Sequence, residues 1–130
     1  MKAARLVAPQ TFDFVELDEP IPVDGQAKIR VEATSVCGSD IHGIYHGATP
    51  EEDYPLAPGV PCHEIAGTIV ESKTDALVEG QRAIVLPTRG MGGLSEYLVQ
   101  TPDRVLPVPD WGGIDEWVMC QHTGTVLYSV

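Results

Sequence analysis

The chain has 130 residues, of which 43% are hydrophobic and 21% charged, and these proportions suit one soluble globular domain with a core of moderate size. Its formal net charge is −11, from 19 acidic and 8 basic residues, and such a surface repels the phosphates of nucleic acids and anionic lipids. We therefore expect no nucleic-acid or membrane partner, and a cytoplasmic location, because the sequence contains neither a signal peptide nor an apolar run of about 20 residues.

Short strands separated by turns dominate the predicted secondary structure. Residues 28–34 give the clearest pattern, because Ile29, Val31 and Ala33 alternate with polar residues and share one face of a half-buried strand. The predicted strands cover residues 2–8, 11–17, 28–34, 64–72, 82–86, 94–101 and 104–108. So many short strands, with two minor helices, predict an all-β barrel or sandwich in one domain.

The segments outside the strands are predicted as loops and short helices. Residues 39–45 suit a short helix with Ser39 or Asp40 as its N-cap, and residues 47–59 a loop. Residues 89–93 indicate a tight, glycine-rich connection. From Asp115 onward the chain favours helix, and the inward-facing positions expected there are Trp117, Cys120, Val126 and Val130.

Residues that bind metals or move protons concentrate at two predicted strand ends. Cys-Gly-Ser-Asp-Ile-His at 37–42 follows one strand, and Cys-His-Glu at 62–64 opens another. A lone cysteine or histidine is more often a packing residue than a ligand. Burying carboxylates and imidazoles together is costly, however, unless they pair or hold a metal, and zinc favours thiol, imidazole and carboxylate ligands. Spacing alone leaves the zinc site and the ordinary polar cluster both open.

Five motifs in the correct order make the chain resemble the zinc-dependent medium-chain alcohol and polyol dehydrogenases. They are Cys-Gly-Ser-Asp-x-His at 37–42, His-Glu-x-x-Gly at 63–67, and the segments 78–83, 92–99 and 105–110. The resemblance covers almost the whole chain and implies a GroES-like, partly open β-barrel. It also implies one catalytic Zn²⁺, a small alcohol, polyol or sugar as substrate, NAD(P) as hydride carrier and a homo-oligomeric full-length enzyme.

The resemblance assigns roles to individual residues. Cys37 and His63 match the first two zinc ligands, and Glu64 matches a carboxylate that coordinates the metal directly or through water. Asp40 matches the carboxylate that holds the ligating histidine. Ser39 matches the hydroxyl that touches the substrate, and His42 the outer end of the proton relay.

Three departures from the family pattern concern the metal. The glycine that usually precedes the His-Glu pair is Cys62 here, and this extra thiol could either bind the zinc or oxidise against Cys37 when the metal is lost; the oxidation is our hypothesis. Residues 87–91 leave no room for the four-cysteine lobe of many members, so we expect at most one zinc per chain. The remaining ligand falls by register on Gln121, whereas chemistry favours Cys120, and we predict Gln121 and a weaker, more open site.

A fourth departure concerns the nucleotide. Gly-Met-Gly-Gly at 90–93 lacks the third glycine and the βαβ setting of a dinucleotide fingerprint, and the chain stops at Val130. We therefore expect the nucleotide-binding domain to lie outside these residues and the 130-residue chain alone to be inactive. The alternative is a non-enzymatic GroES-like metal-binding or assembly module. A zinc-free quinone reductase of the same fold is disfavoured because those proteins lack the cysteine and histidine ligands.

Overall fold

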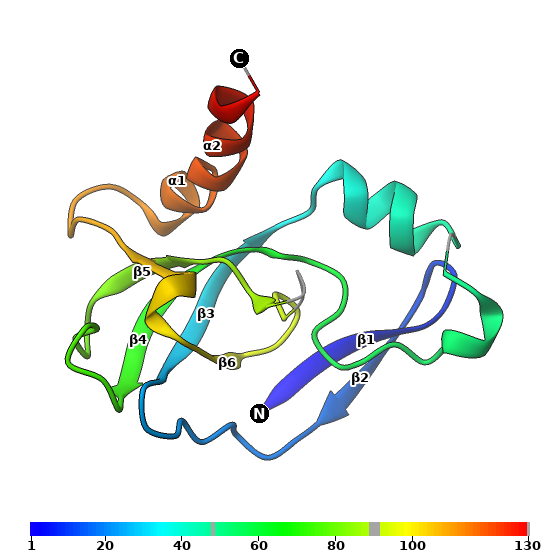
Figure 1. Ribbon diagram of the computed structural model, residues 1–130. Coiled ribbons are helices and arrows are strands. Elements are labelled where there is room, and N and C mark those ends of the chain that lie inside the picture. Colours follow the sequence, from blue (N-terminus) through cyan, green and yellow to red (C-terminus); the bar gives the residue numbers. More distant parts are fainter. Residues whose placement is uncertain (48, 89–91, 130) are drawn as a thin grey trace.

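The computed structural model describes residues 1–47, 49–88 and 92–129. It contains a curled antiparallel sheet, a separate β-hairpin and helices toward the C-terminal end (Figure 1). The hairpin consists of β1 (Lys2–Ala8) and β2 (Thr11–Glu16). The sheet has the order β6-β3-β4-β5-β7, from β3 (Ala27–Ser35), β4 (Glu64–Ser72), β5 (Arg82–Val85), β6 (Tyr97–Gln100) and β7 (Val105–Pro107). The predicted class, mostly strands in a GroES-like half-barrel, is confirmed.

The core lies on the inner face of this sheet. Ile29 is fully buried, and Val31, two residues further along β3, packs against the same cluster, as the alternating pattern predicts. The buried cluster comprises Ala27, Ile29, Ile65, Ile69, Leu77, Ala83, Val85, Leu98 and Val105. Burial in the first half of β4 includes both faces, because helix α1 (Ile114–Val118) packs against β3 and β4.

The pairing of β3 with β4 sets the position of the polar motifs. The two strands are antiparallel, and Ser35 at the end of β3 lies opposite Glu64 at the start of β4. Gly67 allows the strands to approach closely beside a register shift, since a Cβ there would meet the Arg30 carbonyl oxygen. Because β3 ends beside the start of β4, the polar motifs at residues 37–42 and 62–64 come together at the same end of these two strands.

The strand predicted at residues 94–101 is shorter in the structure. β6 begins at Tyr97, because residues 94–96 cross to the hairpin instead of following β3 throughout. The Ala4 amide donates to the Leu94 carbonyl at 2.8 Å, and the Glu96 amide donates to the Lys2 carbonyl at 3.1 Å. This segment therefore joins the hairpin to the sheet. Residues 89–91 of the predicted tight connection lie outside the described residues.

The helix predicted at residues 39–45 is present as η1 (Asp40–Tyr45), a short π-helix. Ser39 occupies the N-cap position but makes no side-chain capping hydrogen bond, and Asp40 is buried in the first turn. The predicted loop at 47–59 contains one 3₁₀ turn, η2 (Glu51–Asp53), and a further turn, η4 (Pro102–Arg104), precedes β7.

The C-terminal residues form α1 and then α2 (Cys120–Tyr128). Trp117 is half-buried, but the prediction that Cys120 and Val126 face inward is wrong, since both are exposed. Val118 is buried instead, because α1 packs on the sheet while α2 projects away from it (Figure 1). Val130 lies outside the described residues. Within the described ranges, no helix has the length and apolar character that a membrane span requires.

Candidate metal centre

Cys37 and His63 meet at the edge where β3 ends and β4 begins. Their ligand atoms, Cys37 Sγ and His63 Nε2, are 3.6 Å apart. Two zinc ligands of these types, at about 2.3 and 2.0 Å from the metal and at a tetrahedral angle, are about 3.5 Å apart. The pair therefore already has the separation that one zinc ion requires.

Asp40 holds this pair in position. Its side chain is 1% exposed, and Oδ2 accepts the Cys37 amide at 3.0 Å while Oδ1 accepts the Cys62 amide at 3.1 Å. Oδ1 also lies 3.2 Å from His63 Nδ1. A histidine that donates Nδ1–H to a carboxylate presents the lone pair of Nε2, which is the usual arrangement behind a metal-ligating histidine. Asp40 thus restrains both Cys37 and His63 from behind.

Ser39 stands beside the thiol, and His42 is further away. Ser39 Oγ is 2.8 Å from Cys37 Sγ, and the Ser39 amide donates to the same sulfur at 3.3 Å. His42 is exposed on η1, where its ring lies 6.5 Å from that of His46. In the described part of the chain no hydrogen bond joins Ser39 to His42.

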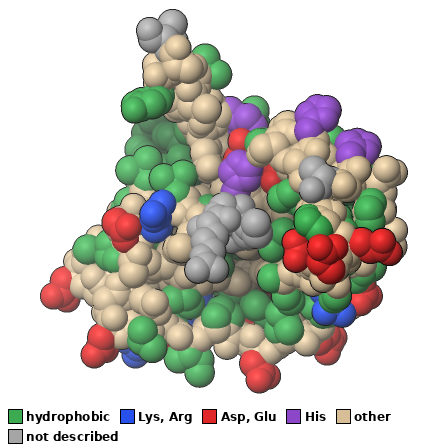
Figure 2. Space-filling view, turned by 45° about the vertical axis from the view of Figure 1, so that its right-hand side comes forward, with side chains coloured by type: hydrophobic (Ala, Val, Ile, Leu, Met, Phe, Trp, Pro, Cys, Tyr) green, Lys and Arg blue, Asp and Glu red, His purple; other side chains and the backbone are tan. Residues whose placement is uncertain are grey.

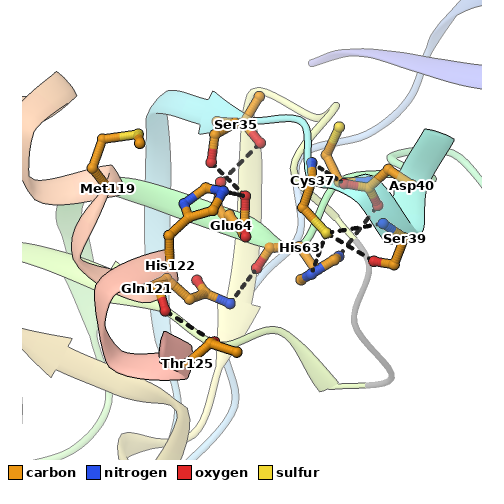
Figure 3. A network of polar contacts seen from close by, with 12 residues as sticks. Ser35, Cys37, Ser39, Asp40, His63, Glu64, Met119, Gln121, His122 and Thr125 are labelled. Atoms are coloured by element: carbon orange, nitrogen blue, oxygen red, sulfur yellow. Dashed lines mark hydrogen bonds and ion pairs between the residues drawn. The ribbon is translucent and has the colours of Figure 1, made fainter. Parts of the chain in front are cut away.

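Glu64 belongs to a second polar group next to the ligand pair. It is 5% exposed, and its Oε2 accepts the Ser35 hydroxyl at 2.7 Å and lies 2.9 Å from His122 Nε2 on α2. A pocket of about 370 Å³ has Cys37, Ser39, His63, Glu64 and His122 among its lining residues. Figure 3 shows Glu64 between the His122 ring and the Cys37–His63 pair.

The electrostatics of the site favour a cation. Asp40 and Glu64 are buried carboxylates whose ion-pair partners, in the described ranges, are histidines rather than lysine or arginine. Histidine side chains gather on this face beside the projecting helix (Figure 2). The ligand atoms of Cys37, Asp40 and His63 all lie within 4.8 Å of one another. A divalent cation would compensate the buried charge and fits the donor set of thiol, imidazole and carboxylate.

Comparison with known proteins agrees with this geometry. Residues 23–110 match the alcohol dehydrogenase GroES-like domain. The chain belongs to this family. Starvation-sensing protein RspB of Escherichia coli K12 is 30% identical over 126 residues, covering 92% of this chain and 36% of that protein. The chain therefore spans only about a third of the length of that relative.

One further relative and one solved structure of similar fold are named dehydrogenases. The sorbitol dehydrogenase of Halalkalibacterium halodurans is 48% identical over 61 residues, which cover 46% of this chain and 16% of that enzyme. The crystal structure of 2R,3R-butanediol dehydrogenase from Bacillus subtilis superposes with a TM-score of 0.75 over 91% of this chain and 43% of that one. At 24% identity this second likeness supports the fold alone.

The two candidates for the remaining ligand are adjacent at the start of α2 and line the same pocket, but they make different contacts. Cys120 is exposed, and its thiol lies 3.9 Å from the Glu116 carbonyl oxygen of the preceding helix. Gln121 Nε2 donates to the His63 carbonyl at 3.2 Å, and its Oε1 is buried without a hydrogen-bond partner in the described part of the chain. Gln121, the residue that the register predicts, is thus the one that contacts His63, but neither candidate lines the pocket of Cys37 and His63, and the remaining ligand stays a prediction.

Cys62 stands where the family usually has glycine, and the backbone explains that preference. Its φ is +88°, a left-handed conformation that glycine adopts without strain. The side chain is 2% exposed, and burial, reinforced by the Asp40 charge, raises the pKa of the Cys62 thiol to about 11. A buried thiol with so little thiolate is a poor redox partner, which disfavours the predicted oxidation against Cys37.

Sequence reasoning missed Ser35 and His122. Ser35 could have been found from the register of β3 and β4, which pairs it with Glu64, but the sequence motifs do not determine that register. His122 follows Gln121 directly, but only Cys120 and Gln121 were candidates in this part of the chain. Its relevance depends on the rotation of α2, which the weak amphipathic pattern of that helix does not define.

Proposed function

We propose that this chain is the catalytic, zinc-binding part of an oxidoreductase that transfers hydride between an alcohol, polyol or sugar and NAD(P). The observation that carries the proposal is the 3.6 Å separation of Cys37 Sγ and His63 Nε2, with Asp40 on the opposite ring nitrogen. The sorbitol dehydrogenase among its relatives supports an alcohol or polyol as substrate. Because the chain spans about a third of RspB, nucleotide binding and homo-oligomer formation are proposed for the full-length enzyme.

Cys37, His63 and Glu64 are the proposed protein ligands, and Gln121 is the proposed additional, weaker one. The unpartnered Oε1 supports the assignment of Gln121, and its amide also fixes the His63 backbone. When bound, zinc acts as a Lewis acid that favours deprotonation of a substrate alcohol. Asp40 keeps His63 in the tautomer that leaves Nε2 free, and so determines which ring nitrogen faces the metal.

Ser39 and His42 are the proposed proton carriers. Ser39 is exposed beside Cys37 and lines the pocket, so its hydroxyl can accept a hydrogen bond from a substrate hydroxyl placed there and pass its own proton on as it takes up the substrate proton. His42 is exposed on η1, and an imidazole can both accept and donate a proton, which suits the transfer of that proton to solvent. Asp40 acts only through its neighbours and is a positioning residue.

The proposal also includes a cytoplasmic location. The cysteines Cys37, Cys62 and Cys120 are free, which suits a reducing compartment. Small organic molecules are the proposed partners, and the net charge of −11 argues against nucleic acid and anionic membranes.

The competing function is a GroES-like metal-binding or assembly module without catalysis. A catalytic zinc site keeps one coordination position open, whereas a structural site is closed by protein ligands. Cobalt(II) should therefore replace zinc in the 130-residue chain and give a visible spectrum that changes when imidazole is added. A cobalt spectrum that is indifferent to imidazole, with full retention of the metal, would favour the non-enzymatic module.

A further inference from the structure

The contact between α2 and β4 has no counterpart in the motifs that define the site. His122 Nε2 lies 2.9 Å from Glu64 Oε2, and the Ser35 hydroxyl donates to the same oxygen at 2.7 Å. The hydrogen bond from Ser35 and the ion pair with His122 thus converge on one oxygen of Glu64, a residue that is 5% exposed. Among the described residues, none donates to the other oxygen, Oε1. The carboxylate is held from one side and left free on the other.

The free oxygen belongs to a residue that lines the same pocket as Cys37 and His63. Carboxylates that bind metals are themselves fixed by hydrogen bonds, and their other oxygen serves as the ligand. The His63–Asp40 pair follows the same logic, since one ring nitrogen is held at 3.2 Å while the other faces Cys37. Glu64 therefore has, like His63, one atom that is restrained and one that is not, and it stands beside the 4.8 Å cluster formed by the ligand atoms of Cys37, Asp40 and His63.

We propose that His122 is a positioning residue of the metal centre, which together with Ser35 holds Glu64 Oε2 so that Oε1 is available to the ion. This inference rests on the proposed metal site at Cys37 and His63. It assigns to α2 a role that does not depend on ligation by Gln121. It also requires the tautomer of His122 that carries hydrogen on Nε2, and Nδ1, which is buried without a partner in the described ranges, is then the unprotonated nitrogen.

Side-chain geometry supplies a sharp test. The amide nitrogen of glutamine reaches about as far from the backbone as histidine Nε2, whereas that of asparagine reaches only as far as Nδ1. His122→Gln can still donate to Glu64 Oε2, and His122→Asn cannot. The metal affinity of the 130-residue chain is measured by calorimetric titration with cobalt(II), for the wild type, both variants and His46→Gln as a control in an exposed histidine.

We expect His122→Asn to bind cobalt(II) about 10–100-fold more weakly, as when other groups that orient metal ligands are removed. His122→Gln and the control should stay within about threefold of the wild type by the same reasoning. Equal affinities in all four proteins would overturn the proposal, because His122 would then merely attach α2 to the sheet. Equal losses in both His122 variants would also overturn it, because the imidazole would itself be a ligand.

The underlying metal site is tested separately in the same titration. Cys37→Ala should abolish binding whatever the His122 variants do. If the wild-type chain bound no cobalt(II), the proposed metal centre would fail, whereas normal binding with unaffected His122 variants would remove only the role of His122.

Discussion

Replacing Asp40 with asparagine should destabilise the protein even when no metal is present. The carboxylate is 1% exposed and accepts the Cys37 and Cys62 amides and the His63 ring N–H at 3.0–3.2 Å. Asparagine has the same shape, but one of its two terminal atoms becomes an NH₂ donor. In either orientation of the amide, this donor must face a buried backbone N–H, so at least one charge-assisted hydrogen bond is lost.

The expected cost is about 1.5–3 kcal/mol, the contribution of one hydrogen bond to a charged group. For a chain of this length each kcal/mol lowers Tm by about 3–5 °C, so Tm should fall by about 5–15 °C. Urea unfolding in EDTA, followed by tryptophan fluorescence, measures the free energy directly. Asp53→Asn is the matched control, because Asp53 is exposed in η2 and the same change there should cost less than about 0.5 kcal/mol. Equal stability of the two variants would refute the role of Asp40 in joining η1 to β4.

The other predictions concern backbone geometry and the buried thiol. Gly67→Ala forces a Cβ against the Arg30 carbonyl oxygen and should lower the free energy of unfolding by about 3 kcal/mol or more. The control is Gly124→Ala in α2, whose added Cβ meets nothing within 4 Å and should stabilise the protein by up to about 1 kcal/mol. A Gly67 variant as stable as the Gly124 variant would contradict the close approach of β3 and β4. Because Cys62 has a φ of +88°, urea unfolding should show Cys62→Gly to be about 1 kcal/mol more stable than Cys62→Ala, and the reverse order would argue against backbone strain. Burial raises the pKa of Cys62 from 9.0 to about 11, so between these two pH values the folded state keeps a thiol proton that the unfolded state releases. The stability that the protonated thiol contributes is therefore complete below pH 9 and is lost as the pH rises to about 11. The unfolding free energy of the wild type should therefore fall more steeply over this interval than that of Cys62→Ala, and parallel curves would contradict a protonated buried thiol.

The residues that sequence reasoning located well are those whose roles depend on strand ends. Cys37 and His63 flank strands with clear alternation, and antiparallel pairing of those strands is enough to bring them together. The position of Asp40 next to His63 also agrees with the expectation, because the family motif fixes its distance along the chain from Cys37, while its role toward a metal ligand stays a prediction. These are short-range features, and short-range patterns are strongest in a sequence.

The residues that sequence reasoning misplaced depend on how elements pack. Cys120 and Val126 were expected to face inward, but α2 projects beyond the sheet and leaves Val126 63% exposed. The π-helical first turn of η1 buries Asp40 and leaves Ser39 to contact the Cys37 sulfur rather than cap the helix. Helix rotation and helix docking are long-range outcomes, and for α2 the hydrophobic pattern is too weak to define them.

The central claim is that one zinc ion binds to Cys37 and His63, and X-ray absorption spectroscopy of the zinc-loaded chain tests it most directly. We predict one zinc per chain with a single sulfur ligand at about 2.3 Å and nitrogen or oxygen ligands at about 2.0–2.2 Å. Cys37→Ala should lose the sulfur shell, whereas Cys120→Ala should keep it, because Cys120 is exposed and its thiol lies near the Glu116 carbonyl oxygen. A zinc without sulfur, or one with two or more sulfur ligands, would contradict the account.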